Sequence, residues 1–239
     1  MVYCRITGGG KVISQKNVED LIRAAEEDLD QNRLQSSLRG LERVLEVDPD
    51  NLEVHYLLAI ALIRVEQFVK AAGHLDRVIE SEFSYLHKQQ AYMMLGYVYV
   101  QRELFERAAE AFETAWAYNF NNVAATAALG HIYFKLERPD RAIEALRRAL
   151  DIDPRNSNAR NSLAYVLCES GGDLEEAQHL ALSVVRMDPD NPLYQDTLGW
   201  IYHKKGKEGL ARDTLKRALE LAPENEEIKA HLRVLLNID

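Results

Sequence analysis

Residues 129–154 read LGHIYFKLERPDRAIEALRRALDIDP, and this stretch decides the fold. Its second half spaces Ala142, Leu146, Ala149 and Leu150 at i, i+4, i+7 and i+8, the spacing of one helix face. The spacing predicts an amphipathic helix that buries this stripe against a neighbour. The connections between such segments are short, as expected for stacked antiparallel helix pairs.

The same pattern recurs along the chain with a period near 34 residues. Pro49, Pro154, Pro189 and Pro223 are separated by 105, 35 and 34 residues, and 105 is close to three periods. Aligning the chain on these prolines gives six repeats. The repeats begin at Val18, Leu52, Gln89, Val123, Ser157 and Pro192.

At two positions of this alignment the side-chain size is nearly constant. The eighth position is always small: Ala25, Ala59, Gly96, Gly130, Ala164 and Gly199. The twenty-fourth is large in all but one repeat: Leu41, Leu75, Phe112, Leu146, Ala181 and Leu215. A small residue lets two helix backbones approach, and a large residue fills the space between them. The two columns therefore predict the contact within each helix pair.

Three repeats carry LGYVY at 95–99, LGHIY at 129–133 and LGWIY at 198–202, each followed by an alanine at the twentieth position. The chain thus resembles the tetratricopeptide repeat family, in a form common in bacterial proteins. The resemblance implies an all-α fold, a right-handed superhelical solenoid of about six helix pairs over residues 18–224. Residues 225–239 form an amphipathic segment that we expect to cap the last pair. Residues 1–17 match no repeat, and we expect a flexible arm there.

Composition excludes several classes of partner. The 29 basic and 38 acidic residues leave a net charge of −9, which disfavours nucleic acid and anionic membranes. No apolar run approaches the ~20 residues that cross a bilayer, so we expect no membrane insertion. Residues 1–10 lack the apolar core of a signal peptide. The expected location is cytoplasmic, or periplasmic if a signal or anchor was removed from a longer product.

No motif supports catalysis or a cofactor. Gly8-Gly9-Gly10-Lys11 resembles a phosphate loop, but Arg5 and Val12 stand where that loop needs Gly and Ser or Thr. The seven histidines form no ligand pair at helical spacing, and Cys4 and Cys168 lie far apart without a CxxC motif. We therefore expect a protein that is not an enzyme and has no metal or cofactor.

In proteins that this chain resembles, the first helix of each pair lines a concave groove. Positions 5, 9 and 12 of each repeat share one face of that helix and form an aromatic-rich row. From them we predict a partner-binding groove formed by Tyr56, Ile60, Met93, Tyr97, His131, Phe134, Asn161, Tyr165, Asp196 and Trp200. Position 13 adds three basic residues along its edge, Arg64, Lys135 and Lys204.

The groove predicts a non-catalytic scaffold for protein–protein interaction. It would bind a peptide or helix of a partner protein through apolar anchors, while the edge bases contact acidic residues. Some related proteins hold two carboxylates through a Lys, Arg and Asn clamp, but positions 5 and 9 contain no Lys or Arg, and only Asn161 matches in kind. Two alternatives stay open: a self-associating structural assembly protein (a homo-oligomer), and an accessory domain of a larger envelope or secretion protein.

Overall fold

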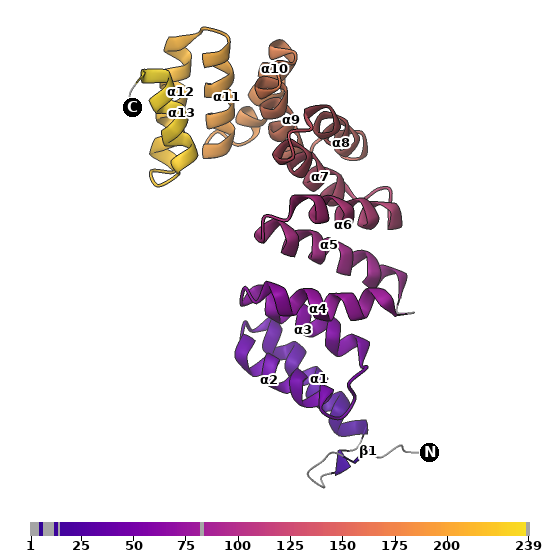
Figure 1. Cartoon of the computed structure of the whole chain (residues 1–239). Coiled ribbons are helices and arrows are strands. Elements are labelled where there is room, and N and C mark those ends of the chain that lie inside the picture. Colours follow the sequence, from indigo (N-terminus) through magenta and orange to yellow (C-terminus); the bar gives the residue numbers. More distant parts are fainter. Residues whose placement is uncertain (1–4, 7–11, 14, 82–83, 238–239) are drawn as a thin grey trace. The chain divides into compact units, whose positions relative to one another are not determined.

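The computed structural model describes residues 5–6, 12–13, 15–81 and 84–237 (Figure 1). Thirteen helices lie in these described ranges. They are α1 (Gln15–Asp30), α2 (Leu34–Leu45), α3 (Leu52–Arg64), α4 (Phe68–Glu80), α5 (Tyr85–Gln101), α6 (Phe105–Tyr118), α7 (Val123–Lys135), α8 (Pro139–Ile152), α9 (Ser157–Glu169), α10 (Leu174–Met187), α11 (Pro192–Lys204), α12 (Glu208–Leu221) and α13 (Glu226–Leu236).

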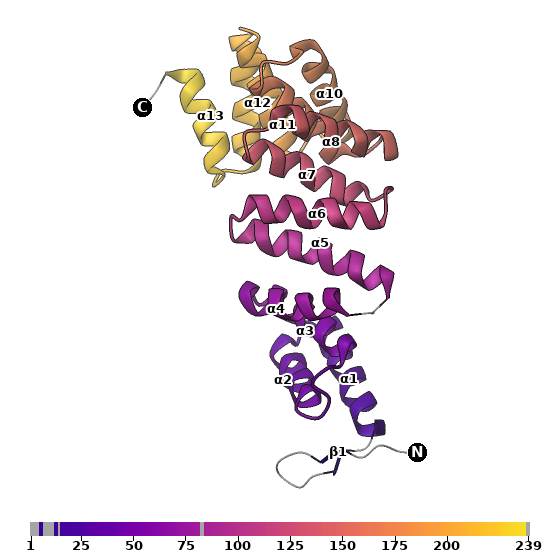
Figure 2. The ribbon, with the colours of Figure 1, turned by 45° about the vertical axis from the view of Figure 1, so that its right-hand side comes forward.

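The helices pair in chain order, α1 with α2 through to α11 with α12, which confirms the predicted all-α architecture of six pairs. After the last pair, α13 packs mainly on α12 and also touches α11 (Figure 2). The chain divides into two compact units, residues 1–120 and 121–239, which we call the N-terminal and C-terminal units. The first three pairs belong to the N-terminal unit and the last three to the C-terminal unit.

The predicted contact inside each pair is present where the eighth position is glycine. A Cβ atom added to Gly96 would lie 2.6 Å from the ring of Phe112, and one added to Gly199 would lie 2.7 Å from Cγ of Leu215. A Cβ atom added to Gly130 would lie still closer to the side chain of Leu146. Phe112, Leu146 and Leu215 are all buried. The paired helices therefore approach to a distance that only glycine permits at these positions.

The turn between the two helices of each pair holds one residue in the left-handed conformation, always at position 15 of the repeat. Three of the six are glutamates, Glu66, Glu103 and Glu137, with φ between 55° and 59°. The others are Asn32, Gly171 and Gly206, with φ of 57°, 74° and 69°. This backbone conformation ends the first helix and redirects the chain into the second.

Asparagines begin most of the first helices. Asn51, Asn122, Asn156, Asn191 and Asn225 each precede such a helix or α13, and each side-chain oxygen accepts from one or two backbone N–H groups of the first turn. These bonds satisfy amide groups that have no partner within the helix.

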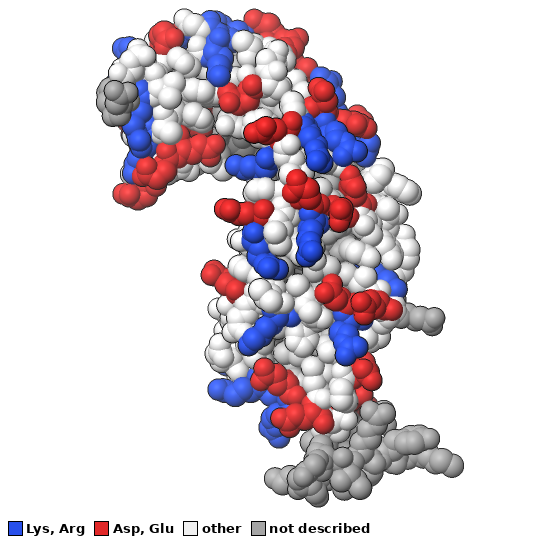
Figure 3. All heavy atoms as spheres, in the orientation of Figure 1, with Lys and Arg blue, Asp and Glu red and all other residues white. Residues whose placement is uncertain are grey.

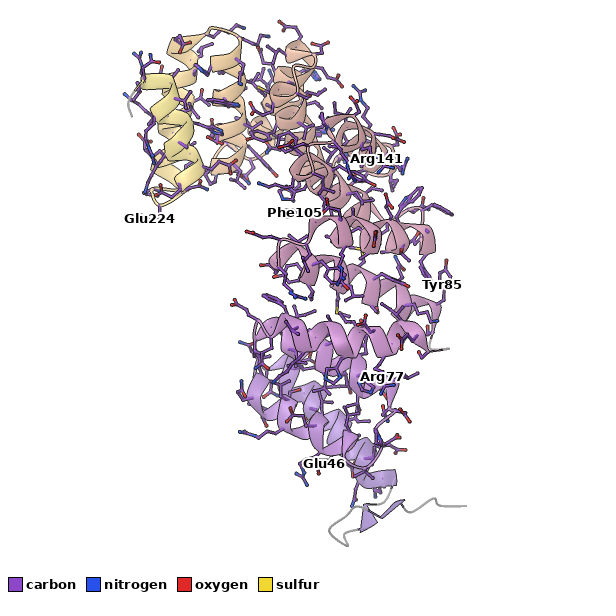
Figure 4. The ribbon with its side chains drawn as sticks, viewed as in Figure 1. Glu46, Arg77, Tyr85, Phe105, Arg141 and Glu224 are labelled. Carbon is purple, nitrogen blue, oxygen red and sulfur yellow. The ribbon has the colours of Figure 1, made fainter. Side chains whose placement is uncertain are left out.

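Two boundaries differ from the sequence prediction. The alignment begins the third repeat at Gln89, but α5 begins at Tyr85 (labelled in Figure 4). The Tyr85 hydroxyl donates to the carbonyl of Tyr118 at 2.5 Å, and the two rings lie 4.6 Å apart, so contacts to α6 hold this extra turn. Likewise α1 begins at Gln15, before the predicted Val18.

Most of the expected arm, residues 1–17, lies outside the described residues, and its flexibility stays a prediction. Within it, β1 (Arg5–Ile6) pairs with β2 (Val12–Ile13) as two short antiparallel strands. The sequence pattern gave no sign of this pairing.

Candidate functional site

In the N-terminal unit, the predicted groove residues are partly covered. Tyr56 is half-buried, donates its hydroxyl to Gln90 at 2.8 Å, and meets the ring of His87 edge-on at 5.2 Å. Ile60 and Met93 are half-buried as well. Tyr97 is 46% exposed, which makes it the most accessible of these four side chains.

In the C-terminal unit, the predicted residues gather around one cavity of about 250 Å³. The first helices of three successive pairs, α7, α9 and α11, line it together with α13. Its lining residues are His131, Phe134, Lys135, Asn161, Ser162, Tyr165, Val166, Leu193, Asp196, Thr197 and Glu227. Five of the ten predicted groove residues are among them, so the structure brings this half of the prediction together.

The cavity has an aromatic wall. Phe134 and Tyr165 meet edge-on, with ring centroids 5.6 Å apart and planes 76° apart. Burial raises the pKa of the Tyr165 hydroxyl, and the carboxylates of Glu227, Glu169 and Asp196 raise it further. The phenol therefore stays neutral at physiological pH and offers a hydrogen bond rather than a charge.

Charged groups of both signs border the cavity. Loss of water around the ring lowers the pKa of His131, the Lys135 ammonium lowers it further, and the Glu227 carboxylate opposes both. The ring of His131 therefore responds to both a cation and an anion, and it favours the neutral form at physiological pH.

Asp196 and Trp200 are predicted groove residues that α13 covers. Trp200 is 7% exposed and Asp196 is 5% exposed. The indole stacks on His231 of α13 at 4.3 Å, and both carboxylate oxygens of Asp196 lie 2.9 Å from His231 Nδ1. A direct contact from Trp200 to a partner would thus require α13 to move. The sequence predicted a capping helix but not that its histidine would seal this ring.

Two of the three predicted edge bases already have partners. Arg64 donates to the carbonyl of Leu29 at 2.7 Å. Lys204 pairs with Glu169 at 3.2 Å and lies 4.9 Å from the Trp200 ring centroid. Lys135 is exposed at the cavity and makes no ion pair within the described part of the chain. It is therefore the edge base whose charge is free to attract or repel a charged group in the cavity.

Cys168 is buried beside this region. Burial raises the pKa of its thiol to about 11, and Glu169 adds to the shift. The thiol is protonated at neutral pH, whereas a nucleophilic cysteine needs a lowered pKa. Its place on α9 is therefore that of a small core residue.

Elsewhere on the described residues, opposite charges are interspersed on the face in view in Figure 3. Surface pairs such as Arg147–Glu176 at 2.8 Å and Arg217–Asp190 at 2.7 Å link neighbouring helix pairs of the C-terminal unit. Within the described ranges, no three His, Cys, Asp or Glu side chains are grouped to hold a metal ion. In those same ranges, no helix is both long enough and apolar enough to traverse a bilayer.

Known proteins match the chain over most of its length. One tetratricopeptide repeat family model matches residues 28–93 and 135–201, a second matches 93–157, and a third matches 194–225. The TPR repeat-containing protein PA4667 of Pseudomonas aeruginosa is 26% identical over 215 residues. The match covers 89% of this chain and 35% of PA4667, so the chain spans about a third of that relative.

Solved structures show the same architecture. The TPR protein YrrB, described as having an unusual peptide-binding site, is 25% identical, with a TM-score of 0.62 over 80% of this chain and 96% of its own. The Pseudomonas aeruginosa protein pilF is 14% identical, with a TM-score of 0.71 over 89% of this chain and 95% of its own. Repeat register, helix pairing and these matches agree, and the chain belongs to the tetratricopeptide repeat family.

Proposed function

We propose that this protein is a non-catalytic scaffold that binds a segment of a partner protein in a groove, with the cavity of the C-terminal unit as its main anchor point. One observation carries the proposal: three successive first helices, α7, α9 and α11, converge with α13 on a cavity lined by predicted groove residues. The likeness to YrrB, described as having a peptide-binding site, supports it.

The size and walls of the cavity favour a side-chain anchor. Its volume of about 250 Å³ is below the ~300–1,000 Å³ typical of sites for drug-sized ligands. Phe134 and Tyr165 supply apolar surface, and Leu193, 51% exposed, extends that surface outward. Aromatic pockets of this kind concentrate binding energy in a few anchors. An extended or helical segment would place one large side chain here and continue along the helices.

Selection from a random peptide library tests the proposal. Peptides enriched on the wild-type chain are compared on Tyr165→Ala, which removes one wall of the cavity, and on Tyr97→Ala, a tyrosine of the N-terminal unit. Circular dichroism confirms that both variants are folded. We expect Tyr165→Ala to weaken binding by roughly 2 kcal/mol, the size of a hot-spot contact, and Tyr97→Ala to have a smaller effect. Enrichment of no peptide, or equal binding to all three chains, contradicts the proposal.

Self-association is a second candidate, favoured by two exposed apolar side chains of α13. Val234 is 54% exposed and Leu236 is 36% exposed on the same helix. A second copy could cover these side chains as another repeat would. Light scattering on the wild type and on Val234→Glu tests this: a dimer mass that falls to the monomer mass in the variant supports it, and a monomeric wild type contradicts it.

A further inference from the structure

The cavity of the C-terminal unit offers more hydrogen-bond acceptors than it satisfies. Oδ1 of Asn161 is enclosed at the cavity wall and has no hydrogen-bond partner among the described residues. An enclosed oxygen of this kind is stabilised by a donor. None of the described residues supplies one, so the donor would come from a ligand in the cavity, and the Asn161 side chain would turn toward the cavity to meet it.

A carboxylate without an ion pair in the described residues also lines the cavity. Glu227 lies in the first turn of α13 and lines the cavity, and in the described part of the chain it makes no ion pair. Its neighbour Glu226 differs, because it pairs with Lys229 at 2.8 Å and with Arg233 at 3.3 Å. The charge of Glu227 adds to the raised pKa of Tyr165 and opposes the lowered pKa of His131, as expected for a carboxylate that lines the same cavity.

The remaining acid of the cavity is already engaged. Both oxygens of Asp196 lie 2.9 Å from His231 Nδ1. Glu227 is therefore an exposed acceptor free of an ion pair, Asn161 adds an enclosed acceptor, and the rings of Phe134 and Tyr165 line the same cavity. A planar guanidinium donates to several acceptors and stacks on aromatic rings.

We propose that the cavity formed by α7, α9, α11 and α13 selects a basic side chain of the partner segment, arginine above all, through Glu227 and Asn161. This inference rests on the proposed function and names the chemistry of its anchor. The apolar part of the side chain packs on Phe134 and Tyr165, and the cationic head reaches the Glu227 carboxylate. Lys135 also lines the cavity, and its positive charge repels the incoming cation.

Four blocked peptides of the form acetyl-Leu-Xaa-Leu-amide, with Xaa as Arg, Lys, Gln or Glu, test the inference. Their dissociation constants are measured on the full chain by following backbone amide resonances of α9 and α13 by NMR. We expect the Arg peptide to bind at least tenfold more tightly than the Gln peptide, the scale of a charge-assisted bond. Glu227→Gln should reduce this preference to about threefold or less.

Matched variants distinguish the effect of the Glu227 charge from an effect on folding. Glu226→Gln, in the same helical turn but already paired on the surface, should leave the preference unchanged. Lys135→Gln should strengthen binding of the Arg peptide severalfold, because it removes the repelling cation. Weaker binding of the Arg peptide to Lys135→Gln contradicts the inference.

Each remaining outcome has a definite meaning. Tightest binding by the Glu peptide, or equal binding by all four, overturns the inference and leaves the cavity as a peptide site of different chemistry. If no peptide shifts the resonances of α9 or α13, both the inference and the proposed function fail.

Discussion

The indole of Trp200 and the imidazole of His231 stack with their planes 19° apart, and this contact joins α11 to α13. His231→Ala should destabilise the C-terminal unit by about 1–3 kcal/mol and admit water to Trp200. Acrylamide quenching of tryptophan fluorescence in a Trp116→Phe background measures that access.

The matched control is His179→Ala, which alters an exposed histidine on α10. It should change neither quenching nor stability. Equal quenching of Trp200 in the His231→Ala variant and the parent chain would mean that α13 does not seal the ring.

Two glycine-to-alanine changes should have opposite signs. Gly130→Ala adds a methyl group against Leu146 and should destabilise the chain by about 1–3 kcal/mol through overpacking. Gly73→Ala lies in the middle of α4, where an added Cβ meets nothing within 4 Å. It should stabilise the chain by about 0.5–1 kcal/mol through helix propensity. Denaturant unfolding measures both, and a stabilising Gly130→Ala would refute the close contact.

Replacing a glutamate that holds the left-handed conformation with glycine should increase the stability of the chain. Glu137→Gly removes the cost of holding a side chain at φ of 56° and should stabilise the chain by about 1 kcal/mol. Glu144→Gly, within α8, should instead destabilise by about 1 kcal/mol. Thermal unfolding of the two variants checks the contrast. A loss of stability in Glu137→Gly would indicate that its side chain contributes a contact that outweighs the strain.

A histidine pair should make the N-terminal unit sensitive to acid. His55 Nε2 donates to the carbonyl of Pro49 at 2.9 Å, and His55 Nδ1 lies 2.8 Å from His74 Nδ1. When both rings are neutral, His74 therefore donates to His55. Burial lowers the pKa of His74 below its ordinary value of 6.5, and the charge of His55 lowers it further.

Since the folded state binds this proton less readily than the unfolded state, the stabilisation is complete above pH 6.5 and is lost as the pH falls through the lowered pKa. Urea unfolding at about pH 7.5 and about pH 5.5 measures it. The His74→Gln variant should lose less stability on acidification than the wild type does. An identical loss in both chains would show that this pair does not control the acid response.

The repeat register was predictable because side-chain size is nearly constant at the eighth and twenty-fourth positions of the repeat. Gly130 and Leu146 lie where the alignment puts them, and their contact follows from size alone. The start of α5 at Tyr85 was not predictable, because it depends on a contact with Tyr118 that is specific to this pair. The left-handed turn was signalled only by Asn32, Gly171 and Gly206, since glutamate carries no comparable preference.

The candidate site was predictable in part for the same reason. Periodicity assigns Phe134, Tyr165 and Trp200 to equivalent faces of successive first helices, and the first two do line the cavity. Trp200 differs because the element that follows its pair is α13 and not another repeat, and α13 brings His231 onto the ring. Glu227 was missed because it lies after the sixth repeat, although it stands 34 residues after Leu193, which also lines the cavity.

Because Glu227 stands on α13, the helix that follows the sixth pair is also a wall of the cavity. Among the described elements, α13 packs mainly on α12 and α11, and a helix with so few neighbours opens at a low free energy. Fraying of α13 and release of a bound segment would then be the same event, governed by one equilibrium. A partner that fills the cavity would slow hydrogen exchange in α13, and a change that loosens α13 would shorten the lifetime of the complex without touching the partner.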